Sequence, residues 1–146
     1  MSALAKEFQL PLKIVSACLV GIECRYNCEH RERREIVEML KSGEILPVCP
    51  EQLAGLATPR PAAEVQAGKV IDNTGKDITD AYEAGAHEAL KLAKLVGATQ
   101  AYLKTKSPMC GHGKIYDGSF SGKLTNGDGI FAKLLQENGI KIIAIE

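Results

Sequence analysis

The sequence contains no tryptophan, and aromatic residues make up only 5% of its 146 positions. It has no excess of either charge, because 18 lysines and arginines balance 18 aspartates and glutamates. The missing basic surplus argues against a strongly cationic nucleic-acid-binding protein, and the missing acidic surplus argues against a disordered acidic tail. Hydrophobic residues account for 45% of the chain, which is typical of a globular protein.

Long apolar runs are missing as well. The apolar stretches 14–20 and 140–145 are far shorter than the ~20 residues that a membrane-spanning helix needs. The N-terminal segment has no basic region followed by a long apolar core, so no secretory leader is expected. We therefore expect a cytoplasmic protein without a membrane partner, whose thiols stay reduced.

The length predicts a single domain over residues 1–146, with 1–11 as a loose lead-in. Apolar, β-branched runs predict strands, and helical periodicity predicts helices between them. This alternation is typical of an α/β, Rossmann-like domain with a mainly parallel four-stranded sheet and helices on both faces. The expected strands are 12–17, 45–48, 98–103 and 141–145, and the expected helices are 30–43, 77 or 79 to 97, and 126 or 128 to 139.

The remaining segments are expected to be loops and one small hairpin. Residues 49–64 are rich in proline, alanine and glycine and are predicted to form an ordered loop, and residues 104–127 are predicted to form a long loop. A turn signal at 73–75 predicts a small β-hairpin insertion within 65–79. The glycine-rich part of the last loop favours a functional role, because a long loop in a compact domain is more often functional than idle.

Five cysteines stand out in a chain whose thiols are expected to stay reduced. A free cysteine is often only a small buried apolar side chain. The positions of the five in the chain must therefore show whether they form a functional site. Cys18 and Cys49 directly follow the first two expected strands, and Cys110 lies in the loop after the third. Because ligands bind beyond the carboxyl ends of parallel strands, we expect these three thiols to share one site.

The residues alone are compatible with several kinds of metal centre. Thiolates select zinc, copper(I) or iron–sulfur clusters, and the usual pair of Cys-x-x-Cys motifs for zinc is absent. A zinc site built from Cys18, Cys24, Cys28 and His30 is one alternative. A closed four-cysteine iron–sulfur cluster, with Cys24 or Cys28 as the fourth ligand, is another.

Polar residues stand beside the expected ligands. Glu51 follows Cys49 by two positions, and Ser107 precedes Cys110 by three. A carboxylate beside a metal centre can act as general base or acid toward water or substrate. The alternatives are a solvated loop acid and a serine that forms a turn. His112, in the glycine-rich segment, is a candidate proton shuttle.

Six short motifs occur together along the chain. They are 16–21 (SACLVG), 25–27 (RYN), 49–51 (CPE), 58–64 (TPRPAAE), 107–111 (SPMCG) and 115–118 (IYDG). In order and spacing they resemble a bacterial family, once of unknown function, whose characterised members include thiouracil desulfidases. The resemblance extends from about residue 12 to the end of the chain.

The resemblance implies a 4Fe–4S cluster held by three cysteines, which by motif are Cys18, Cys49 and Cys110. It also implies that the fourth iron has no protein ligand and binds a thiocarbonyl sulfur, and that Glu51 and Ser107 are catalytic. The implied reaction converts 2-thiouracil to uracil and hydrogen sulfide. This desulfuration involves no net redox change, so no electron-transfer partner is required.

The chain departs from the family pattern at two places. Asn27-Cys28 stands where Asp-Gly is usual, and Met109 stands where serine is common. Because relatives often carry valine at the position of Cys24, the resemblance does not make Cys24 a ligand. These departures bear on the preferred thiolated pyrimidine more than on the cluster.

Two further sets of residues bear on the substrate. Arg25 and Arg60 are candidates for substrate binding, since arginine makes bidentate contacts to planar groups, with structural salt bridges as the alternative. Thiouridine in tRNA is an alternative substrate that the zero net charge disfavours. It is kept open by the lysines around the last loop, Lys104, Lys106, Lys114 and Lys123.

Overall fold

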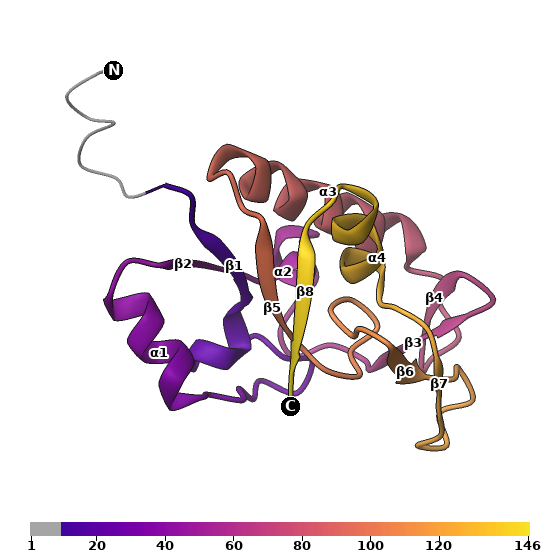
Figure 1. The fold of residues 1–146 in the computed structure, drawn as a ribbon. Coiled ribbons are helices and arrows are strands. Elements are labelled where there is room, and N and C mark those ends of the chain that lie inside the picture. Colours follow the sequence, from indigo (N-terminus) through magenta and orange to yellow (C-terminus); the bar gives the residue numbers. More distant parts are fainter. Residues whose placement is uncertain (1–9) are drawn as a thin grey trace.

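The structure is a computed structural model that describes residues 10–146. Its centre is a sheet of four parallel strands in the order β2–β1–β5–β8. Figure 1 shows these strands side by side in the middle of the molecule. The prediction of a four-stranded parallel sheet in an α/β domain is confirmed. The strands are β1 (Lys13–Ser16), β2 (Ile45–Val48), β5 (Gln100–Lys104) and β8 (Lys141–Ile145).

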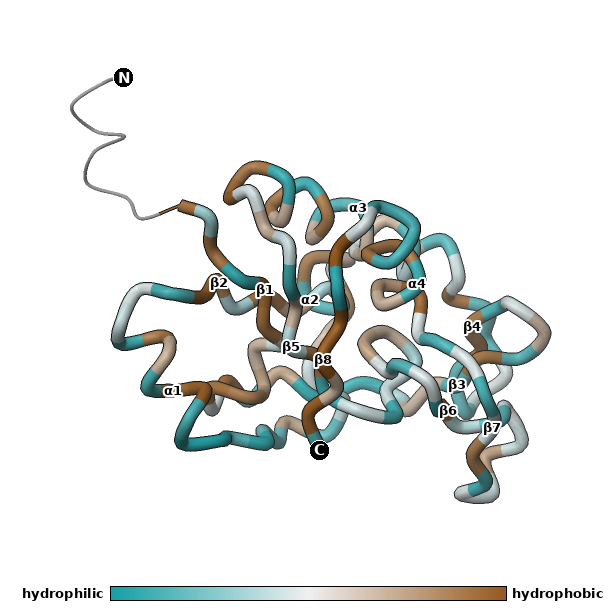
Figure 2. The backbone as a smooth tube through the Cα atoms, viewed as in Figure 1, coloured by the Kyte–Doolittle hydropathy of each residue, from teal (hydrophilic) through white to brown (hydrophobic). Residues whose placement is uncertain are grey.

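Helices cover both faces of this sheet, as predicted. Two helices, α3 (Thr79–Leu95) and α4 (Ile130–Glu137), pack on one face, and α1 (Arg34–Lys41) packs on the other (Figure 1). Alternation along β1 explains the two layers, because Ile14 belongs to the α3–α4 core and Val15 to the α1 core. Figure 2 shows hydrophobic positions along β1 and β8, in the interior of the fold.

The first expected helix is shorter than the sequence predicts. It begins at Arg34 rather than near residue 30. The backbone N–H groups of Arg31 and Arg33 donate instead to the carbonyls of Cys18 and Leu19, which holds the segment extended. Those carbonyls belong to η2 (Ala17–Val20), a short 3₁₀ turn that directly follows β1.

The two expected loops contain regular structure. The segment 49–64 begins with a short helix, α2 (Pro50–Leu53), and the segment 104–127 contains a hairpin of β6 (Lys114–Tyr116) and β7 (Leu124–Asn126). Neither element has enough residues to show a hydrophobic period, which is why the loop prediction was wrong there.

The other hairpin is present, but its turn lies elsewhere. It pairs β3 (Ala63–Gln66) with β4 (Lys69–Asp72), so the turn falls at Ala67-Gly68 and not at 73–75. Both turn residues have positive φ, +48° and +81°, as a two-residue hairpin turn of type I′ requires. The predicted turn at 73–75 is a second turn, in which the Asp72 side chain accepts the N–H groups of Thr74 and Lys76.

Two further expectations concern the chain as a whole. The predicted lead-in over residues 1–11 lies outside the described residues, apart from Leu10 and Pro11. Among the helices of residues 10–146, none is both long and apolar enough to cross a membrane.

Candidate functional site

A cavity of about 510 Å³ opens at the carboxyl ends of three strands. Ser16 at the end of β1, Val48 at the end of β2 and Lys104 at the end of β5 all line it. The chain runs from β1 outward to β2 and then crosses to β5 on the other side of β1. The cavity therefore lies where the strand order reverses, which is where α/β sheets bind ligands.

The structure brings three of the predicted ligands to this cavity. Cys18 in η2, Cys49 just before α2 and Cys110 in the loop after β5 all line it. All three are free thiols. The fold thus places Cys18, Cys49 and Cys110 along one cavity at the carboxyl edge of the sheet.

Backbone contacts fix each of these cysteines. Arg31 donates its N–H to the Cys18 carbonyl at 2.8 Å, and Cys49 forms the N-terminal cap of α2. The Ser107 hydroxyl oxygen accepts the N–H groups of Met109 and Cys110, both at 3.0 Å. Ser107 therefore shapes the turn that carries Cys110, in addition to lining the cavity itself.

Burial and hydrogen bonds give the thiols unequal acidities. Burial raises the pKa of Cys18 from 9.0 to about 11 and raises the pKa of Cys110 well above its usual value. A hydrogen bond from the Cys24 thiol, together with one from the Gln52 N–H, lowers the pKa of Cys49 to about 7. The same hydrogen bond raises the pKa of Cys24, because Cys24 keeps the shared proton.

The four residues of the alternative zinc site do not lie together. Cys24 is buried beside Cys49 and lines the cavity, whereas Cys28 and His30 are not among the residues that line it. Within residues 10–146, no three Cys, His, Asp or Glu side chains stand close enough together to hold a single metal ion. The mononuclear zinc site drawn from Cys18, Cys24, Cys28 and His30 has no counterpart in the fold.

Glu51 lines the cavity, and only one of its two carboxylate oxygens is hydrogen-bonded within residues 10–146. Its Oε2 accepts hydrogen bonds from Arg60 Nη2 at 2.8 Å, Arg60 Nε at 3.1 Å and the Tyr82 hydroxyl at 2.9 Å. Oε1 makes none with the residues that the structure describes. Gly85 on α3 allows α2 to pack closely enough for Glu51 to reach Tyr82. A Cβ at Gly85 would stand 2.1 Å from the Pro50 carbonyl and force α2 away from α3.

The two predicted substrate-binding arginines differ in their surroundings. Arg60 is not among the lining residues, and its side chain is only 7% exposed. Its donors go to Glu51, to the Cys24 carbonyl and to Thr58, which matches the structural alternative. Arg25 lines the cavity, and its Nη1 is the one buried side-chain polar atom without a hydrogen-bond partner in the described part of the chain.

Only two of the four lysines around the last loop line the cavity, and the candidate proton shuttle does not. Lys104 and Lys106 line the cavity, whereas Lys114 and Lys123 do not. Burial and the charges of neighbouring arginines lower the pKa of Lys104. His112 pairs with Asp128 at 2.9 Å and is not a cavity residue.

Sequence reasoning missed two groups at this site. Tyr82 lies in α3 with its ring buried, and its hydroxyl donates a hydrogen bond to Glu51. Ser16 ends β1, and its hydroxyl oxygen accepts the Lys104 N–H at 3.0 Å. A hydrogen bond from the same hydroxyl to Cys110 offsets part of the rise that burial causes in the pKa of that thiol. Both contacts join residues far apart in the sequence, so no local sequence pattern predicts them.

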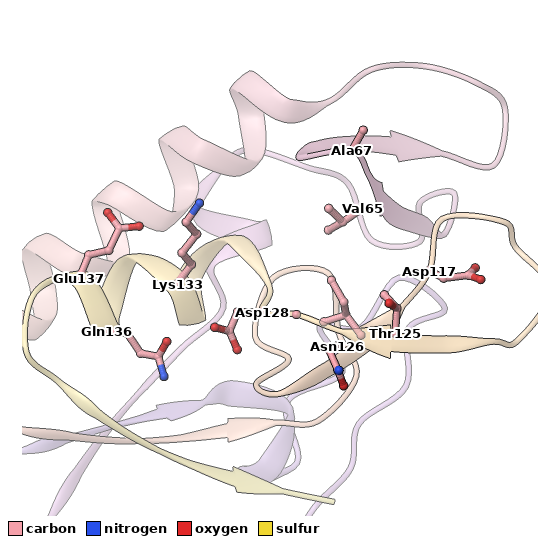
Figure 3. Close-up of a pocket in the computed structure, with 11 residues that line it drawn as sticks. Val65, Ala67, Asp117, Thr125, Asn126, Asp128, Lys133, Gln136 and Glu137 are labelled. Atoms are coloured by element: carbon pink, nitrogen blue, oxygen red, sulfur yellow. The ribbon is translucent and has the colours of Figure 1, made fainter.

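A second cavity lies away from the cysteines. It has a volume of about 570 Å³ and is lined by residues of β3, the β6–β7 hairpin and α4. Figure 3 shows its polar side chains, among them Asp128, Lys133 and Glu137. None of the cysteines lines it.

Comparisons with known proteins show the family of the chain. YbbK, an uncharacterised protein of Bacillus subtilis (strain 168), is 40% identical over 141 residues, which cover 90% of this chain and 93% of that protein. The solved structure of TudS, described as a 4Fe–4S-dependent thiouracil desulfidase, matches with a TM-score of 0.87 and 38% identity, over 91% of this chain and 89% of that one. The model of the 2-thiouracil desulfurase family matches residues 14–146. The chain therefore belongs to the 2-thiouracil desulfurase family.

Proposed function

We propose that this protein is a 4Fe–4S-dependent desulfidase of thiolated pyrimidines, which converts 2-thiouracil to uracil and hydrogen sulfide. Family membership and the likeness to TudS support the reaction class. One observation of the fold carries the proposal further. Three free thiols from three separate segments line a single cavity, and an anchored carboxylate, Glu51, lines it with them.

The cavity suits a cluster better than a single ion. The cysteines that hold a 4Fe–4S cluster bind different irons, so they would stand further apart than the ligands of one metal ion. Cys18, Cys49 and Cys110 would hold the cluster, and Cys49, with its pKa of about 7, is the thiol most ready to bind iron. The unpartnered Nη1 of Arg25 provides a positive charge for an anionic occupant of the cavity.

With one iron free of protein ligands, the bound cluster supplies a Lewis acid toward a thiocarbonyl sulfur. The chain itself supplies the proton transfers. Glu51 takes a proton from water through Oε1, while Arg60 and Tyr82 hold its Oε2 in place. The Ser107 oxygen already accepts two N–H groups, so its own proton is available to donate to the substrate.

The overall reaction balances without an oxidant or reductant. Water adds its oxygen to the carbon that bears the sulfur, the carbon–sulfur bond breaks, and uracil and hydrogen sulfide leave. No electron-transfer partner is therefore needed. Sulfide release from 2-thiouracil by anaerobically reconstituted protein, compared with Glu51→Gln, tests the proposal.

Thiouridine in tRNA is a second candidate substrate, because four cationic residues line the cavity. They are Arg25, Arg31, Lys104 and Lys106. Phosphate contacts make binding fall steeply with salt. Turnover of thiolated tRNA that drops steeply between low and moderate salt, with turnover of the free base unchanged, would favour the nucleic acid.

A further inference from the structure

Phe120 has an unusual combination of exposure, position and backbone geometry. Phe120 is 38% exposed and lines the cavity that holds the three cysteines. Its φ is +55°, in the left-handed region that glycine adopts freely and aromatic residues rarely enter. Strain of this kind persists only where the surrounding structure enforces it, and it gathers at ligand sites.

Contacts from β3 enforce this conformation. The Glu64 carboxylate accepts the N–H groups of Gly118 at 3.0 Å and Phe120 at 3.1 Å. Gln66 donates to the Gly118 carbonyl at 2.6 Å. Gly118 fits closely against the strand, because a Cβ there would stand 2.7 Å from the Val65 carbonyl. The loop that joins β6 to β7 is thus seated on β3, and its aromatic residue is directed to the cavity.

The cavity gathers aromatic rings from a chain that has few. There are four tyrosines, three phenylalanines and no tryptophan in the sequence. Four of these rings, Tyr26, Tyr82, Tyr116 and Phe120, line this one cavity. The Tyr82 hydroxyl is engaged with Glu51, and Tyr26 and Phe120 are the two that remain substantially exposed. An exposed ring in a cavity of this kind offers a face for stacking.

We propose that Phe120 stacks on the heterocycle of the substrate, and that Glu64 is a positioning residue that holds the Phe120 ring in place. The inference rests on the proposed function, since it takes a pyrimidine as the occupant. It adds that the cavity selects planar, aromatic thiocarbonyl compounds over saturated ones. Glu64 also lines the cavity, but the role assigned to it runs through the loop backbone, by its hydrogen bonds to the N–H groups of Gly118 and Phe120.

The test compares two ligands that differ in planarity. Uracil and 5,6-dihydrouracil carry the same carbonyl and N–H groups, but only uracil is flat and aromatic. Stacking of a base on an aromatic side chain gives about a tenfold preference for uracil in titrations of the reconstituted wild-type protein. Phe120→Leu loses this preference, and Phe120→Tyr keeps it.

A further variant separates stacking from folding. Phe120→Gly relieves the left-handed strain, so the protein should melt no lower than wild type and still lose the preference. Glu64→Ala, with cluster absorbance unchanged, should raise the KM for 2-thiouracil more than it lowers kcat. Leu124→Ala is the matched control, because Leu124 is 42% exposed on β7 of the same hairpin and does not line the cavity.

The inference is wrong if wild-type protein binds neither ligand or binds both equally, or if the Phe120 variants keep the preference for uracil. Its failure differs from failure of the proposed function. If the protein releases sulfide from 2-thiouracil but the Phe120 variants keep the preference for uracil over 5,6-dihydrouracil, only the inference is overturned. A preference that depends on Phe120, without sulfide release from any thiolated pyrimidine, upholds stacking and overturns the desulfidase proposal.

Discussion

Replacement of Arg60 by methionine should destabilise the protein strongly. The Arg60 side chain is 7% exposed and that of Glu51 is 17% exposed, so the variant leaves a carboxylate in the interior without its countercharge. Removal of one partner from a buried ion pair costs about 3–5 kcal/mol. For a chain of this size we expect a fall in Tm of about 6–20 °C.

The assay is urea unfolding of the apoprotein, because no cluster then contributes to stability. Lys91→Met is the matched control. Lys91 pairs with Glu88 at 3.1 Å, but their side chains are 65% and 55% exposed, so its loss should change stability by less than about 0.5 kcal/mol.

A double variant isolates the charge effect in the buried pair. Glu51→Gln removes the charge that Arg60 balances, and the amide oxygen can still accept from the Tyr82 hydroxyl. Arg60→Met combined with Glu51→Gln should therefore be more stable than Arg60→Met alone by at least about 1 kcal/mol. If Arg60→Met unfolds like the Lys91 control, or if the two single effects simply add, the account of Glu51 is refuted.

The remaining predictions concern the cysteines. In the apoprotein, the pKa of Cys18 is about 11 in the folded state against 9.0 in the unfolded state, so the folded state holds more protons between these values. The free energy of unfolding should therefore fall by about 2 kcal/mol from pH 9 to pH 11. Urea titrations should show this loss in wild type and less of it in Cys18→Ala; equal pH slopes would contradict the assignment. Cys24→Ala should keep its iron and acid-labile sulfide, since the proposed cluster has three ligands, and loss of the cluster would favour the closed four-cysteine alternative. In the same variant, the pKa of Cys49 should rise from about 7 toward 9.0, because its hydrogen-bond donor is gone, and the pH dependence of iodoacetamide alkylation measures this.

Much of the fold and the meeting of the cysteines could be predicted from the sequence. Local apolar runs located all four strands of the sheet, and the general rule for the carboxyl ends of parallel strands then placed Cys18, Cys49 and Cys110 at one edge. Neither step depends on long-range packing, which explains their success. Cys49-Pro50-Glu51 also carries a signal for α2, since proline favours the first position of a helix.

Other features depend on contacts that no local pattern encodes. The Tyr82 hydroxyl meets Glu51 across 31 positions of sequence, and Phe120 owes its conformation to Glu64, 56 positions away. The hairpin turn was misplaced for a related reason. Burial of Val70 opposite Val65 sets the register of β3 and β4, and this outweighs the stronger turn signal at 73–75.

The most direct test of the central claim is stoichiometric. Anaerobically reconstituted protein incubated with 2-thiouracil, without an added reductant or oxidant, should release one hydrogen sulfide for each uracil formed. Glu51→Gln with the same iron content should be slower by about 10²-fold or more, as expected for loss of a general base. A fully loaded protein that releases no sulfide, or a Glu51→Gln variant that turns over like wild type, would contradict the account.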